Sequence, residues 1–104
     1  MPPVSAITDA DVERVRRLVA AIPPGRVTTY GDLAAAAGLA GPRVAGTIMR
    51  IDSADLPWHR VIAASGRPPA HLAARQLTRL ASEGVPVVNG RVVITECRWS
   101  PEVN

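Results

Sequence analysis

The stretch LPWHRVI, residues 56–62, gathers the side chains of this chain that are best suited to chemistry. Pro57 restricts the backbone just before a large aromatic ring, Trp58, a titratable imidazole, His59, and a guanidinium, Arg60. The β-branched residues that follow favour a buried, extended segment. Two interpretations are open at this point. The three side chains form a functional cluster, or Trp58 belongs to the core, His59 is a buried and satisfied imidazole, and Arg60 is half of an ion pair.

The composition limits the classes of protein to consider. A chain of 104 residues predicts one domain over residues 1–104, with its core at about 8–101. No apolar run approaches the roughly 20 residues that a membrane span needs, and the first residues lack the basic and apolar regions of a secretory signal. We therefore expect a cytoplasmic protein without a membrane partner. A single cysteine, Cys97, excludes an internal disulfide, and with two histidines beside it the sequence predicts no metal site and no cofactor.

The net charge of +3 points weakly to a nucleic-acid partner. All twelve positive residues are arginine, whose planar fork suits phosphates and base edges. A coding sequence rich in G and C would give the same bias toward arginine, alanine and glycine. The charge is therefore modest support only.

Helix signals predict the elements that would position these groups. Thr8 and Asp11 form a capping box before a helix over about 9–22, and Thr29 with Asp32 forms a second one before a helix over 30–37 that Gly38 ends. Pro42 opens a third helix to about residue 50, with an inward face of Val44, Ile48 and Ile51. Two helices joined by a short turn that contains glycine indicate a helix-turn-helix, whose second helix would present Arg43 to DNA.

The second half of the chain completes a winged arrangement. Residues 63–69 predict a loop, and residues 70–82 a helix with an apolar face of Leu72, Gln76 or Leu77, Leu80 and Ala81. Asn89–Gly90 predicts the turn of a β-hairpin over 85–94. We expect Trp99 to pack the tail onto the body. The predicted fold is mainly α with a small β-hairpin, a winged helix-turn-helix.

The chain resembles the DNA-binding domain of the O6-alkylguanine-DNA alkyltransferases and, more narrowly, the alkyltransferase-like proteins. Four motifs carry the resemblance, in the family's order: IPPGRVTTYGDLA over 22–34, PRVAG over 42–46, PWHRVI over 57–62 and LASEGV over 80–85. The enzymes have Pro-Cys-His-Arg, and their cysteine takes the alkyl group from guanine. Here Trp58 holds that place. Because an indole is not a useful nucleophile near neutral pH, and Cys97 lies far along the chain, the resemblance implies no catalytic residue and no alkyl transfer.

The resemblance also assigns roles to individual residues. Tyr30 would push on the target phosphate and Arg43 would fill the space left by the rotated base, while Gly46 and Thr29 would lie on the DNA. Trp58, Met49, Val61 and Arg67 would line the pocket for the lesion, with the backbone carbonyls of Trp58 and Val61 as acceptors. His59 and Glu83, a proton relay in the enzymes, would remain as a structural hydrogen-bonded link, and Arg60 would be structural. The implied partners are duplex DNA with O6-alkylguanine and nucleotide excision repair proteins, for a monomer that lies on the nucleoid when bound.

Departures from the family leave alternatives open. The loop after Gly66 is short, His71 and Leu72 fall where the enzymes have a pocket-closing Tyr-Ser, and Asp52 stands near the place of a usual asparagine. A winged-helix DNA-binding or architectural protein without lesion specificity is therefore the main alternative to a lesion sensor. An alkyltransferase that uses another nucleophile is the third.

Overall fold

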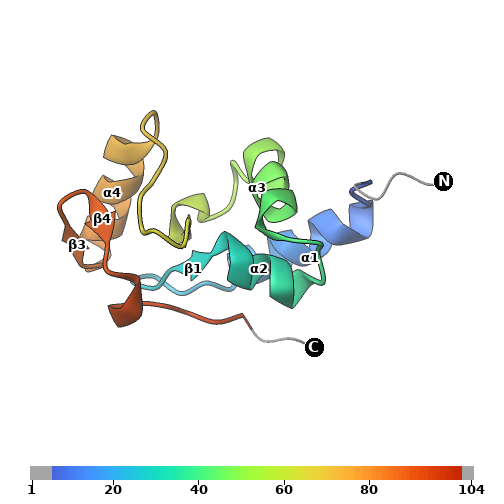
Figure 1. Cartoon of the computed structure of the whole chain (residues 1–104), viewed down its shortest axis with the longest axis horizontal. Helices are drawn as coiled ribbons and strands as arrows, with labels where there is room; N and C mark the ends of the chain where they lie inside the picture. Colours follow the sequence, from blue (N-terminus) through green and yellow to red (C-terminus); the bar gives the residue numbers. More distant parts are fainter. Residues whose placement is uncertain (1–5, 102–104) are drawn as a thin grey trace.

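The computed structural model describes residues 6–101 (Figure 1). Within them the chain forms four α-helices, two short 3-10 helices and two sheets of two strands. In chain order the elements are α1 (Asp9–Ala20), β1 (Thr28–Thr29), α2 (Tyr30–Ala37), α3 (Pro42–Ile51), η1 (Trp58–Arg60), β2 (Val61–Ile62), α4 (Ala73–Ser82), β3 (Val87–Val88), β4 (Arg91–Val92) and η2 (Ile94–Glu96). No helix in this part of the chain is both long and apolar enough to cross a membrane.

The predicted capping residues set the helix starts. At α1 the Thr8 hydroxyl accepts from the Asp11 backbone N–H, and the Asp11 carboxylate accepts from the Thr8 N–H, each at 3.0 Å. At α2 only half of the predicted box forms. The Thr29 hydroxyl accepts from the Asp32 N–H at 3.0 Å, but the Asp32 carboxylate binds Arg98 instead. The first helix stops at Ala20, two residues before its predicted end.

The inward face of α3 differs in part from the prediction. Ala45, Ile48 and Met49 are its buried residues, and Val44 packs against the same core while partly exposed. Ile51, predicted to be buried, is 66% exposed. Positions 45, 48 and 49 follow the i, i+3, i+4 spacing of one helix face, whereas Ile51 is the last helical residue and lies at the edge of that face. The prediction for Ile51 was wrong.

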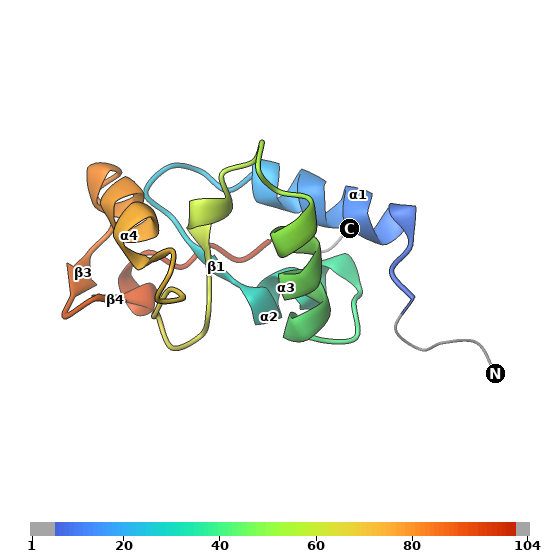
Figure 2. The same cartoon turned by 90° about the horizontal axis from the view of Figure 1, so that it is seen from above.

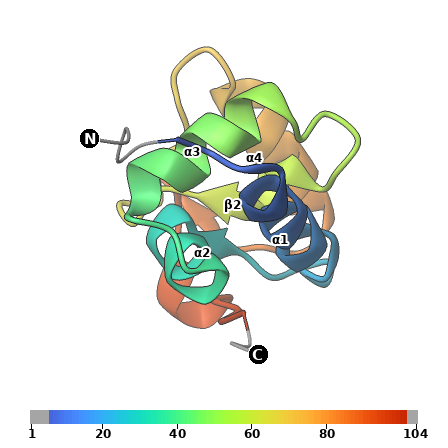
Figure 3. The ribbon, with the colours of Figure 1, turned by 90° about the vertical axis from the view of Figure 1, so that its right-hand side faces the viewer.

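Two hydrophobic clusters hold the elements together. The first joins α1, α2 and α3 around Val15, Leu33 and Ile48, and the second joins α4 to the C-terminal hairpin around Leu80 and Val92. Between them β1 pairs with β2 in parallel, a contact that the sequence analysis did not anticipate. Figure 3 looks along the molecule, with α1, α2 and α3 in front of β2.

The C-terminal elements form close to where they were predicted. α4 begins at Ala73 rather than residue 70, and of its expected apolar face Gln76 and Leu80 are buried while Ala81 is exposed. The hairpin turns at Asn89–Gly90, both at positive φ as a type I′ turn requires. It lies beside α4, at the end of the molecule away from α3 (Figures 1 and 2). The Trp99 N–H donates to the Val27 carbonyl at 2.7 Å and its ring packs on the first cluster, which confirms that the tail returns to the body.

Candidate nucleic-acid interface

The outward face of α3 carries Arg43, Gly46 and Arg50. Their spacing of three and then four residues puts them opposite the buried Ala45, Ile48 and Met49. Both arginines are exposed, and a Cβ added at Gly46 would meet nothing within 4 Å. Two guanidinium groups thus flank a position without a side chain, and a charged polymer could approach the helix backbone closely there.

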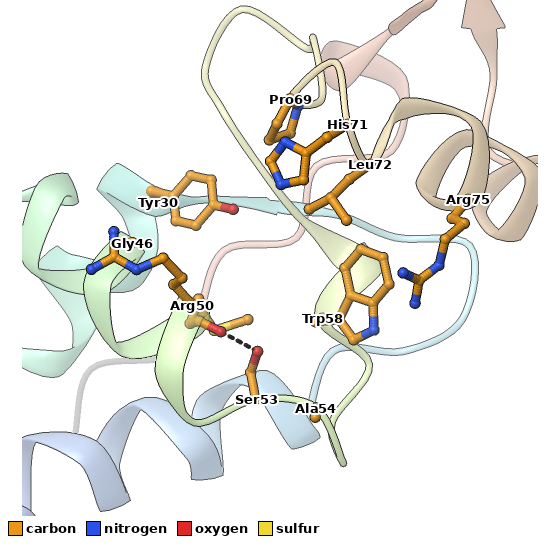
Figure 4. A pocket seen from close by; sticks show the side chains of 11 residues that line it. Tyr30, Gly46, Arg50, Ser53, Ala54, Trp58, Pro69, His71, Leu72 and Arg75 are labelled. Atoms are coloured by element: carbon orange, nitrogen blue, oxygen red, sulfur yellow. Dashed lines mark hydrogen bonds between the residues drawn. The ribbon is translucent and has the colours of Figure 1, made fainter.

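A cavity of about 520 Å³ opens next to this face (Figure 4). Gly46 and Arg50 belong both to the helix face and to the lining of the cavity. The volume falls within the range of small-ligand sites and is ample for one nucleobase. Its apolar and aromatic walls are Tyr30, Met49, Trp58, Pro69 and Leu72, and its polar side chains are Arg50, Ser53, His71 and Arg75.

Tyr30 enters the cavity from the first residue of α2. The cap by Thr29 and the pairing of β1 with β2 fix the backbone on its N-terminal side. Its hydroxyl points toward the cavity in Figure 4. Partial burial raises the pKa of the phenol, so the hydroxyl keeps its proton at neutral pH and can donate a hydrogen bond.

Trp58 faces Tyr30 across the cavity (Figure 4). The Arg75 and Arg79 guanidinium carbons lie 5.5 Å and 5.3 Å from the centre of its ring, within the range of cation–π interactions. The edge of His59 meets the indole at 87°, with the ring centres 6.2 Å apart. Contacts with Arg75, Arg79 and His59 thus hold the indole ring of Trp58 at the cavity wall.

Behind Trp58, one carboxylate ties three segments of the chain together. Glu83 accepts two hydrogen bonds from Arg60, at 2.7 and 3.0 Å, one from the backbone N–H of Gly25 at 3.1 Å, and pairs with His59 Nε2 at 2.8 Å. Arg60 also donates to the Ile22 carbonyl at 2.9 Å. The Arg60 guanidinium and, after it, the His59 contact hold the pKa of Glu83 at about 2, against a cost of burial. The predicted link between His59 and Glu83 is confirmed as a contact, and so is the structural place of Arg60.

The side chains of three predicted site residues lie outside the cavity. Thr29 is 6% exposed because its hydroxyl caps α2, so its side chain is not on the surface. The Val61 side chain is fully buried in the first cluster, since β2 turns it inward. Arg67 is exposed on the loop and is not part of the cavity lining. The prediction of Arg67 in the cavity lining was therefore wrong. The DNA contact of Thr29 and the acceptor role of the Val61 carbonyl do not depend on these side chains and stay predictions, whereas Trp58 and Met49 do line the cavity.

Sequence reasoning missed three arginines, Arg50 among them, and a glutamine at or near the cavity. Arg75 and Arg79 reach Trp58 from one face of α4, and their i, i+4 spacing was the available signal. The buried Gln76 amide donates to the carbonyls of His59 and Val61, at 3.1 and 3.0 Å. The Trp58 carbonyl accepts from the Val61 N–H. Both predicted acceptor carbonyls therefore already have one partner each, and each keeps a second lone pair.

Nucleophilic chemistry at the cavity has no thiol to use within residues 6–101. Cys97 lies in the second cluster, 3% exposed, and its Sγ donates to the Val93 carbonyl at 3.4 Å. Burial raises the pKa of this thiol, which disfavours the reactive thiolate. Over the same residues no three histidine, cysteine or acidic side chains gather as metal ligands. The cavity is equipped to stack and hydrogen-bond a planar ligand.

Comparison with known proteins gives consistent matches. Residues 11–85 match the family model of the DNA-binding domain of 6-O-methylguanine DNA methyltransferase. A DNA base-flipping protein of Escherichia coli K12 is 40% identical over 101 residues, which cover 88% of this chain and 76% of that protein. The structure of S. pombe Atl1 in complex with damaged DNA containing O6-carboxymethylguanine has a TM-score of 0.79 at 30% identity, over 92% of this chain and 100% of that one. The O6-methylguanine methyltransferase of Mycobacterium tuberculosis has a TM-score of 0.63 at 29% identity, over 75% of this chain and 50% of that one.

Proposed function

The chain belongs to the family of the 6-O-methylguanine DNA methyltransferase DNA-binding domain, and from that membership we propose that it is a non-enzymatic sensor of O6-alkylguanine in duplex DNA. It binds the duplex through the outward face of α3 and flips the modified base into the cavity between Tyr30 and Trp58. The observation that carries the proposal is the position of this cavity, which opens at Gly46 and Arg50 of the same helix face.

The flipping step follows from the residues at the mouth of the cavity. Extruding a base costs a few kcal/mol of stacking and pairing, and an alkylated guanine, which pairs poorly, costs less. Arg43, in the first turn of α3, fills the vacated space, because a guanidinium plane can stack on the neighbouring bases and bond the orphaned partner. Tyr30 presses on the phosphate of the flipped nucleotide, and Trp58 offers its ring to the flipped base.

We expect no transfer of the alkyl group to the protein, because Trp58 stands in the place of the alkyl-accepting cysteine. With no thiol to ionise, His59 and Glu83 hold the fold together instead of relaying a proton. A duplex with an isotope-labelled O6-methyl group, incubated with the protein and followed by intact-protein mass spectrometry, should leave the protein mass unchanged. An adduct at any residue would mean an active alkyltransferase instead.

The biological context of the proposed sensor follows from the resemblance to its family. We propose a monomer that acts in the cytoplasm, on the nucleoid, without a cofactor or a metal, and that marks the lesion for nucleotide excision repair proteins. The support is the resemblance to alkyltransferase-like proteins and, for the last step, the lack of a chemical means of repair at the cavity.

Fluorescence titration tests the proposal directly. At matched salt, a duplex with O6-methylguanine should bind more tightly than the unmodified duplex, and Arg43→Ala should remove this preference. Arg91→Ala is the matched control, because Arg91 is equally exposed but lies on the hairpin away from α3. Equal affinity of the wild-type protein for both duplexes would refute lesion sensing.

A DNA-binding protein without lesion preference is the second candidate, and one observation favours it. Arg67, on the shortened loop, does not reach the cavity. Under this alternative Arg43→Ala weakens binding to both duplexes by the same factor, as the loss of any phosphate contact would.

A further inference from the structure

The basic side chains that line the cavity are not matched by any acidic side chain in the lining, within residues 6–101. Its ionisable or basic side chains besides Tyr30 are Arg50, His71 and Arg75, and among the described residues, 6–101, no aspartate or glutamate lines it. Three nitrogen groups therefore face a space whose other walls are largely apolar. All three side chains are exposed, so water partly screens their attraction for a negative charge.

The acidic residues nearest to the cavity are engaged with arginines outside its lining. Asp52 and Asp55 flank the lining residues Ser53 and Ala54, but both bind Arg16 of α1, at 2.9 and 2.5 Å. On the far side of Trp58, Glu83 is taken by Arg60 and His59. The positive groups of the cavity thus keep their charge uncompensated by a carboxylate within the lining.

His71 is the group with the most direct access. It stands in the turn before α4, and its ring points into the cavity in Figure 4. The titratable groups that share the cavity with it are Tyr30 from α2, Arg50 from α3 and Arg75 from α4. An imidazole in this place can donate one hydrogen bond when neutral and two when protonated.

Arg75 is the second group, and Trp58 restrains it. Its guanidinium lies over the indole, 5.5 Å from the ring centre, which limits the rotamers of a long side chain. Arg79 touches the same ring from one turn further along α4, but it is not part of the lining. The two arginines are therefore a matched pair, with one at the cavity and one outside.

We infer that the cavity selects O6 substituents that end in a negative charge, such as a carboxylate, with Arg75 as the counter-charge and with His71 as a second hydrogen-bond donor. The inference rests on the proposed function and adds a substrate class to it. A charge-assisted hydrogen bond is about twice as strong as a neutral one, so an anionic substituent should bind roughly ten-fold more tightly than a neutral one of the same shape.

Two isosteric lesions test the inference. O6-carboxymethylguanine and O6-carbamoylmethylguanine have nearly the same size and shape, but only the first is charged at neutral pH. Competition titrations would compare both in one duplex sequence, next to O6-methylguanine and unmodified guanine, at fixed salt and pH. We expect the roughly ten-fold preference for the carboxymethyl lesion. His71→Gln or Arg75→Gln should reduce the preference, and Arg79→Gln should keep it.

Each other result has a definite meaning. Equal affinity for the two isosteres, with both bound better than unmodified guanine, would overturn the charge selection and leave lesion sensing intact. A preference that survives both His71→Gln and Arg75→Gln would overturn the assignment to these residues. If Arg79→Gln reduces the preference as much as His71→Gln or Arg75→Gln does, the preference is a general effect of positive charge and not a property of the cavity. If no O6 lesion binds better than unmodified guanine, the proposed function itself fails.

Discussion

Glu83→Gln should cost the protein a large part of its stability while leaving its shape almost unchanged. The carboxylate binds Arg60 through two hydrogen bonds and also holds His59 and the Gly25 N–H. The side chains of His59, Arg60 and Glu83 are only 9, 15 and 16% exposed. A neutral amide keeps the volume but leaves the Arg60 charge buried without a carboxylate partner, with the Ile22 carbonyl still bound, and that situation is costly.

The magnitude follows from the pKa of Glu83. The bonds from Arg60, and after them the one with His59, lower this pKa from 4.5 to about 2. At about 1.4 kcal/mol per pH unit the difference corresponds to ~3–4 kcal/mol, which residual solvent screening reduces to ~2–3 kcal/mol. This is a substantial share of the 5–15 kcal/mol that typically separates folded from unfolded states.

Urea unfolding followed by circular dichroism checks this value. At pH 7 the free energy of unfolding of Glu83→Gln should lie ~2–3 kcal/mol below that of the wild-type protein. Because the folded-state pKa is depressed, the wild-type advantage is fully present above pH 4.5 and is lost as the pH falls toward 2. The two unfolding curves should therefore converge in acid.

Asp55→Asn is the control, because its carboxylate also binds an arginine but its side chain is 64% exposed. We expect a change within the scatter of the measurement, since exposed ion pairs contribute little. A Glu83→Gln loss no larger than that of Asp55→Asn, or a difference between Glu83→Gln and the wild type that stays constant down to pH 2, would refute the role of Glu83 as the central anchor.

Four further outcomes are expected. Gly46→Ala should raise the free energy of unfolding by about 1 kcal/mol, because alanine favours a helix more than glycine does and its methyl group would meet open space. In fluorescence titrations with duplex DNA the same variant should bind more weakly, because the methyl group keeps the duplex away from the helix. Gly66→Ala should lower the free energy of unfolding, measured with urea, by about 2 kcal/mol or more, because its Cβ would lie 2.4 Å from the Val92 carbonyl oxygen at a φ of +78°. Tyr30 is the single tyrosine, so an absorbance titration should place its pKa above the ordinary value of about 10 in the native protein and near it in urea. Cys97 should react with a thiol reagent much more slowly in the native protein than in the unfolded chain, and equal rates would contradict its burial.

Local signals in the sequence were enough to predict most of the elements. The capping residues, Gly38 and the Asn89–Gly90 turn act within a few residues of the backbone that they shape, so their effect needs no knowledge of the rest of the fold. The exposed Ile51 shows the limit of this reasoning. A hydrophobic residue at a helix end is buried only if another segment covers it, and none of the described segments does.

The site was predictable only in part for the same reason. The resemblance pointed to Trp58 and Met49, and both line the cavity. Arg75 could not be placed, because its contact with Trp58 depends on how α4 crosses η1. Arg67 was assigned to the pocket by its position in the loop, but it is not among the residues that line the cavity.

The parallel ladder between β1 and β2 also bears on the order of folding. It is only two residues long, but it joins Thr28–Thr29 to Val61–Ile62, and so sets Tyr30 and Trp58 on opposite sides of the cavity. Closing such a long loop is entropically slow compared with forming the α2–α3 hairpin. During synthesis or refolding, the α2–α3 pair can form first. The cavity forms only when the second half of the chain packs against this pair. A fragment that ends after α3 would therefore keep the α2–α3 pair but lack the cavity, and under the proposed function it could not distinguish a damaged base.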